Sequence, residues 1–130
     1  AGVDSLAKLE HMGRGYKVPN GGIYSTPNDL AKFMASSMGH LEILSQSNLA
    51  KMQSKQTPEG NYGLGFFLYE DSTISTVGHG GGVAGYTCDL LFEKESQYGV
   101  IQMRNYNRGN TSLNTSSVAL IRKLKTQDFE

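Results

Sequence analysis

Apolar side chains recur at helical spacing in the first third of the chain, directly after a clear start signal. The segment from Thr26 predicts a helix, because Thr26 suits the N-cap, Pro27 the first helical position, and Asp29 stands three residues after the cap. Gly39 then ends the helix. The apolar face of this helix consists of Leu30, Phe33, Met34 and Met38.

A second, shorter helix is expected after Ser45, with Leu49 and Met52 facing the core. Residues 55–60 are polar and contain Pro58, so they are interpreted as a loop. The first half of the chain is therefore predicted to be helical.

From residue 62 onward, helical spacing gives way to the alternation that is typical of strands. We expect four strands, which span residues 62–70, 73–79, 86–93 and 98–105, with turns at 71–72 and 94–97. The clearest alternation puts four side chains on one face: Tyr86, Cys88, Leu90 and Phe92. On this pattern Cys88 is interpreted as a small core residue.

The chain returns to helical spacing near its end. A polar loop over 106–111 precedes a helix expected over 112–125, with Leu113, Ser117, Leu120, Ile121 and Leu124 at helical intervals. Helices, then antiparallel strands, then a helix predict an α+β fold, an antiparallel sheet covered by helices. Residues 1–20 show little periodicity, so they are interpreted as a linker or irregular segment before a folded part over 21–130.

Composition narrows the function classes. The 130 residues suffice for one domain, and 12 basic residues balance 12 acidic ones without a basic patch, which argues against nucleic acid. No apolar run is long enough to span a membrane. Cys88 is the single cysteine, which excludes an internal disulfide and leaves the compartment undecided. The three histidines, His11, His40 and His79, do not form a metal-ligand motif, so no metal or cofactor is predicted.

The stretch from Val77 to Tyr86 holds one histidine, His79, among five glycines. Glycines gather where the backbone needs unusual angles or where a ligand comes close, so this stretch is interpreted as the wall of a binding cleft. Residues 80–85 also match the dinucleotide pattern GxGxxG, but a strand rather than a helix follows. The HGGG oxyanion pattern over 79–82 lacks the GxSxG elbow that accompanies it in α/β-hydrolases.

The residues from Ser5 to Lys8 match SxxK, the nucleophile motif of penicillin-recognising serine enzymes. The motif requires a helix buried beneath a cleft, whereas the residues that follow Lys8 are polar and broken by glycines. We therefore interpret this match as coincidence.

Three segments together resemble the serine beta-lactamase-like family, which includes class C beta-lactamases, D,D-peptidases and related esterases. They are GGIYSTPNDLAKF over 21–33, YGLGF over 62–66 and GHGGGVAGY over 78–86, and Asn105 follows at the end of a later strand. The resemblance covers residues 13 to 125. It implies the C-terminal part of the beta-lactamase/transpeptidase-like fold.

The resemblance also implies roles for single residues. His79, Gly80 and Gly81 would form the K/H-x-G strand that touches the substrate, with His79 as the polar group of the cleft and Gly81 as the close-approach position. Gly82 would offer its backbone N–H as one of two oxyanion-hole donors. The family's YxN motif does not occur here, and Ser5 lies too close to Gly21 for the family's order of motifs.

The chain is therefore expected to be the C-terminal part of a serine hydrolase whose nucleophile lies elsewhere, and to be inactive alone. The implied partners are a small acyl substrate or a peptidoglycan-like peptide, and the missing N-terminal half; a dimer is a further possibility. Members of the family are often periplasmic or exported. The alternative is a non-enzymatic module that binds peptide or glycan, or that pairs its sheet edge with a partner.

Overall fold

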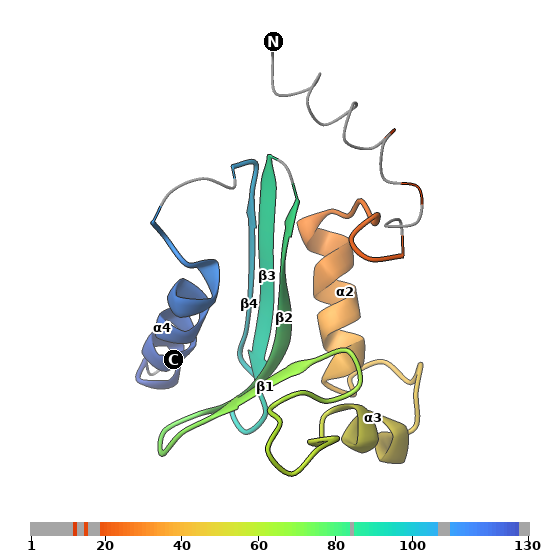
Figure 1. Cartoon of the computed structure of the whole chain (residues 1–130). Helices are drawn as coiled ribbons and strands as arrows, with labels where there is room; N and C mark the ends of the chain where they lie inside the picture. The colour runs from red at the N-terminus through yellow and green to blue at the C-terminus, as the bar shows by residue number, and fades with distance from the viewer. Residues whose placement is uncertain (1–11, 13–14, 16–18, 84, 107–109, 128–130) are drawn as a thin grey trace.

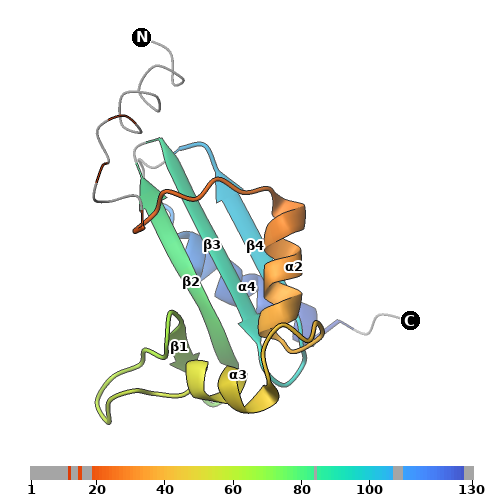
Figure 2. The ribbon, with the colours of Figure 1, turned by 90° about the vertical axis from the view of Figure 1, so that its right-hand side faces the viewer.

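The structure is a computed structural model that describes residues 12, 15, 19–83, 85–106 and 110–127. Its elements, in chain order, are α2 (Pro27–Ser37), α3 (Gln46–Met52), β1 (Phe67–Glu70), β2 (Ser75–Val83), β3 (Tyr86–Glu93), β4 (Gly99–Arg104) and α4 (Leu113–Lys125). The strands form one antiparallel sheet in the order β1-β2-β3-β4. Helix α2 lies on one face of the sheet and α4 on the other, while α3 lies at the end nearest β1 (Figures 1 and 2). The predicted α+β class is confirmed.

Helix α2 begins as predicted. The Asp29 N–H donates to the Thr26 hydroxyl over 3.2 Å, and Pro27 occupies the first turn. Gly39 follows the helix with a φ of +89°, a conformation that glycine adopts without strain. Phe33 was expected on the apolar face, but 55% of it is exposed, and it stacks on Phe66 at the side of the helix, with ring centroids 6.5 Å apart.

The main core lies between α2 and the sheet. Its buried residues are Phe66, Val77, Leu90 and Phe92, and the side chains packed against them include Leu30, Met34, Met38, Met52, Leu68 and Ile101. The predicted inward residues of α3 are confirmed, since Leu49 is buried and Met52 packs on this core. Burial of apolar surface at about 25 cal/mol per Å² makes this layer the main source of stability.

The opposite face of the sheet packs on α4. Ile121 and Ser117 are fully buried there, and the Gln102 amide on β4 donates to the Ser117 hydroxyl over 2.8 Å. The helix begins at Leu113, with Ser112 as its N-cap, close to the predicted start.

Glu93 ties the end of β3 to α4 and to the neighbouring turn. It is 1% exposed, and its carboxylate accepts hydrogen bonds from the N–H and hydroxyl of Ser96, each 2.6 Å long, and from Lys125 Nζ at 3.2 Å. Burial acts to raise the pKa of Glu93, but the donors from Ser96, Ser75 and Lys125 outweigh it and lower the pKa to about 2. The carboxylate is therefore charged in the folded chain at neutral pH.

Three predicted strands have other bounds, although the strand expected over 98–105 differs from β4 by only one residue at each end. The strand expected over 62–70 is confined to β1, because the chain folds back before it: Gly65 has a φ of +83°, and the Gly63 N–H donates to the Phe66 carbonyl over 2.8 Å. Tyr62 therefore pairs with Phe67 in an isolated bridge. The strand expected over 73–79 starts at Ser75 and continues to Val83, so the three consecutive glycines at 80–82 belong to a strand.

The interpretation of Cys88 as a core residue is wrong. Tyr86, Cys88, Leu90 and Phe92 do share a face, but only Leu90 and Phe92 are buried, and Cys88 is exposed. The buried pair lies in the core beneath α2, and the exposed pair lies nearer the hairpin that joins β2 to β3. Alternation thus predicted the shared face, but not how far the covering layer extends.

Two further expectations concern other parts of the chain. Most of residues 1–20, including Ser5 and Lys8, lie outside the described residues. Among the helices of the described part, none is long and apolar enough to cross a membrane.

Candidate functional site

The four candidate residues stand together at a sharp change in exposure along β2. Residues 76–78 are buried, whereas His79, Gly80, Gly81 and Gly82 are all exposed. Residues 76–78 thus belong to the core, and residues 79–82 form an exposed continuation of the same strand.

The same point on β2 is where its outer edge loses its partner strand. Pairing between β1 and β2 ends at Phe67 and Gly78. On the inner side β2 continues to pair with β3, from His79 opposite Leu90 to Gly82 opposite Thr87. In the described part of the chain, no strand pairs with the outer edge of residues 79–82. This edge is a template for an extended chain to pair with.

Hydrogen bonds hold the ring of His79 at this edge. Its Nδ1 lies 2.5 Å from the carbonyl oxygen of Gly80, and its Nε2 lies 2.9 Å from the hydroxyl of Tyr62. Phe67 adds a ring contact, with centroids 4.9 Å apart. His79 is thus a polar group on the strand edge whose two ring nitrogens both have hydrogen-bond partners.

Internal packing restricts the glycines of this strand to different degrees. A Cβ on Gly78 would overlap the backbone of Leu90 and lie 2.8 Å from the Cα of Leu91. A Cβ on Gly82 would meet Thr87 Cγ2 at 3.5 Å, an ordinary contact. A Cβ on Gly80 would lie 3.0 Å from Asp89 Oδ1, and a Cβ on Gly81 would lie 3.3 Å from the Cys88 Sγ, both closer than ordinary contacts. Internal packing therefore explains Gly78 and restricts positions 80 and 81, but it does not explain why position 82 is glycine.

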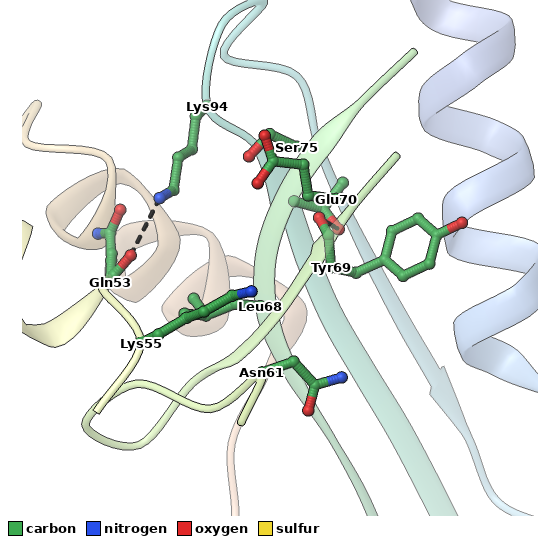
Figure 3. Close-up of a pocket in the computed structure, with 9 residues that line it drawn as sticks. Gln53, Lys55, Asn61, Leu68, Tyr69, Glu70, Ser75 and Lys94 are labelled. Atoms are coloured by element: carbon green, nitrogen blue, oxygen red, sulfur yellow. Dashed lines mark hydrogen bonds between the residues drawn. The ribbon is translucent and has the colours of Figure 1, made fainter. Parts of the chain in front are cut away.

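A separate hollow of about 380 Å³ lies beside β1 (Figure 3). Its lining is polar and consists of Gln53, Lys55, Asn61, Leu68, Tyr69, Glu70, Ser75, Thr76 and Lys94. Lys94 Nζ donates to the Gln53 carbonyl over 3.0 Å, while the Tyr69 ring points across β1 towards α4 (Figure 3). None of the four candidate residues lines this hollow. The candidate site is thus an open strand edge.

The structure adds Tyr62 to the candidate residues. Its place in YGLGF was visible in the sequence, but that segment was interpreted as one continuous strand. Gly63 and Gly65 were the available signal, since a pair of glycines two residues apart favours a turn. Among the described residues, no group of three or more His, Cys, Asp and Glu side chains could hold a metal ion.

Comparisons with known proteins agree with this geometry. A family model described as Beta-lactamase matches residues 2–121. The crystal structure of D-amino acid amidase from Ochrobactrum anthropi SV3, complexed with D-phenylalanine, is similar over 79% of this chain, with a TM-score of 0.57 and 24% sequence identity. The matched part is 36% of the amidase chain. The comparison with curated proteins gives no match. Since the family model spans nearly all of the described elements, the chain belongs to the beta-lactamase family.

Proposed function

We propose that residues 21–130 are the C-terminal part of a serine hydrolase, and that the outer edge of β2 forms one wall of its active site. The observation that carries the proposal is the exposed, strand-free edge of residues 79–82. The reaction would be acyl transfer from an amide, ester or lactam to a serine, followed by hydrolysis. The amidase named above supports an amide as the first substrate to test.

The backbone of Gly82 is proposed to stabilise the oxyanion. The Gly80 carbonyl accepts a hydrogen bond from the His79 ring, so it is directed to the outer edge. In an antiparallel pair, successive residues direct their N–H and C=O groups alternately towards and away from the partner strand. The N–H of Gly82, two residues further on, is therefore also directed outward. An N–H so placed can donate to the negative oxygen of a tetrahedral intermediate.

The proposed role of each residue in the reaction follows from the chemical groups that it carries. His79 supplies a polar ring next to the substrate, and Gly81 leaves room for a backbone to approach. The serine nucleophile, its lysine and the second oxyanion donor would come from the part of the protein that matches the remaining length of the amidase. One oxyanion donor contributes on the order of 3 kcal/mol to lowering the barrier, and it acts only when a nucleophile is present.

The second candidate function is a module that binds an extended peptide along the same edge. It needs the outward-directed backbone groups of Gly80 and Gly82 but no nucleophile. The sequence upstream of Ala1 distinguishes the two functions, because a hydrolase requires SxxK on a helix and YxN there.

The test uses a D-amino acid amide, nitrocefin and short p-nitrophenyl esters with the 130-residue chain, alone and co-expressed with the upstream half. We expect no turnover by the chain alone and turnover by the combined protein. Ser5→Ala is the matched control, and we expect it to change neither result. Turnover by the chain alone that disappears in Ser5→Ala would contradict the proposal, since it would make Ser5 the nucleophile.

A further inference from the structure

Tyr62 reaches His79 from outside β2. The two residues are 17 positions apart, and the fold-back at Gly63 and Gly65 returns Tyr62 to the end of β1. Its hydroxyl thus lies beside the first residue of β2 that has left the β1 pairing. The contact joins the segment before β1 directly to the proposed active-site strand.

Ring packing places Tyr62 independently of this hydrogen bond. Its ring meets Phe67 edge-on, at a centroid distance of 4.7 Å and an interplanar angle of 85°. It meets His79 in the same manner at 5.8 Å. Replacing Tyr62 by Phe therefore removes the hydroxyl and leaves these ring contacts possible.

The partners of the two ring nitrogens decide where the proton of His79 resides. The Gly80 carbonyl can only accept, so Nδ1 carries the hydrogen in the 2.5 Å contact. In a neutral imidazole the other nitrogen is then an acceptor. Nε2 therefore accepts the hydrogen of the Tyr62 hydroxyl, 2.9 Å away. Both ring nitrogens thus have a hydrogen-bond partner, so a substrate that approaches this edge would contact the hydrogen-bonded His79 and Tyr62 side chains together.

We propose that Tyr62 is a positioning residue, whose hydroxyl donates to Nε2 and holds the ring of His79 at the strand edge. The Gly80 carbonyl selects the Nδ1–H tautomer, and the Tyr62 hydroxyl fixes the orientation of the ring by its bond to the other nitrogen. The importance of this role for hydrolysis rests on the proposed function, because that function places His79 beside the substrate. The tautomer itself is a property of the 130-residue chain.

The test is ¹⁵N NMR of the histidine rings in the 130-residue chain at about pH 8, where a histidine ring is ordinarily neutral. His79→Gln assigns the His79 signals among those of the three histidines. We expect the Nδ1–H pattern for His79 both in the unaltered chain and in Tyr62→Phe, because the Gly80 carbonyl is present in both. In Tyr62→Phe we expect the Nε2 signal to shift, because Nε2 loses its hydrogen-bond donor. Tyr69→Phe is the matched control, since the Tyr69 hydroxyl donates to Asp71 over 2.8 Å and does not contact His79.

Two results would overturn the proposal: an Nε2–H pattern in the unaltered chain, or an unchanged Nε2 signal in Tyr62→Phe. The first is read from the unaltered chain once His79→Gln has assigned the signals, so it decides even where Tyr62→Phe does not fold. In the hydrolysing protein we expect Tyr62→Phe to lower kcat/KM roughly two- to tenfold, the range of one net hydrogen bond. A shifted Nε2 signal in Tyr62→Phe with activity intact would refute the role of Tyr62 alone, whereas the expected Nε2 shift in a protein without any hydrolysis would refute the proposed function.

Discussion

Replacing Gly78 by alanine tests the packing that separates the core part of β2 from its exposed part. The added Cβ would overlap the Leu90 carbonyl oxygen and lie 2.8 Å from Leu91 Cα and 3.0 Å from the Leu90 carbonyl carbon. Carbon atoms in contact prefer about 3.5–4.0 Å, so β2 and β3 must separate by roughly 1 Å. Overpacking costs about 1–3 kcal/mol, and we expect the upper end because backbone must move.

The matched control is the same substitution four residues along the strand. At Gly82 the new Cβ would meet only Thr87 Cγ2, at 3.5 Å. Both variants lower the entropy of the unfolded chain equally, by about 0.4–1 kcal/mol, so the difference between them isolates the clash. For a chain of this size, about 3 kcal/mol corresponds to a fall in Tm of about 12 °C.

The assay is thermal unfolding followed by circular dichroism, with urea unfolding as a second measure of the free energy. We expect Gly78→Ala to unfold about 12 °C below Gly82→Ala, and Gly82→Ala to unfold at or slightly above the unaltered chain. Equal melting temperatures for the two variants would refute the β2–β3 register on which the site is built.

Three further predictions concern stability and surface chemistry. Thr26→Ala removes the N-cap of α2 and should cost about 1 kcal/mol in urea unfolding, whereas an unchanged midpoint would show that the cap is not used. Glu93→Gln should cost about 1–3 kcal/mol, because Lys125 loses its buried charged partner. The pKa of Glu93 in the folded chain lies below its unfolded value, so the charged carboxylate stabilises the folded chain above about pH 4.5, and this stabilisation is lost as the pH falls towards 2. In Glu93→Gln this part of the loss of stability in acid should be absent. Cys88 should react with a thiol reagent in the folded chain, and protection until unfolding would contradict its exposure.

The sequence predicted correctly the helices and strands whose ends are set by residues close by in the chain. The cap at Thr26 and the cap at Ser45 each accept a backbone N–H, and both helices begin where the sequence indicates. Strand β3 has the predicted bounds, because its alternation is unbroken and the turn after it is polar. In such segments, propensity, apolar pattern and turn residues all favour the same structure.

The remaining features depend on contacts between distant parts of the chain. The turn before β1 depends on a positive φ at Gly65, which the aromatic residues around it obscure. The exposure of Cys88 depends on how far the layer over the sheet extends, and alternation carries no information on that length. The hydrogen bond between Tyr62 and His79 joins residues 17 positions apart. The family resemblance selected His79 to Gly82, but it did not supply the partner of His79.

Proline substitutions at neighbouring glycines separate the chemistry of the site from its folding. Proline lacks an N–H, and strands tolerate it where that N–H is directed away from a partner strand. By the alternation along β2, this holds for Gly82 and not for Gly81, whose N–H is directed towards β3. We therefore expect Gly81→Pro to destabilise the chain and Gly82→Pro to leave its fold intact.

The most direct test of the proposed active-site wall is kcat/KM of the hydrolysing protein carrying Gly82→Pro, compared with Gly82→Ala. Proline removes the proposed oxyanion donor, and loss of one such donor costs about 100- to 1,000-fold in rate. Alanine keeps the N–H, so we expect its activity to stay within about threefold of the unaltered protein, a change of less than about 1 kcal/mol. A folded Gly82→Pro variant with undiminished kcat/KM would contradict the account, because the outward N–H of Gly82 would then have no part in the reaction.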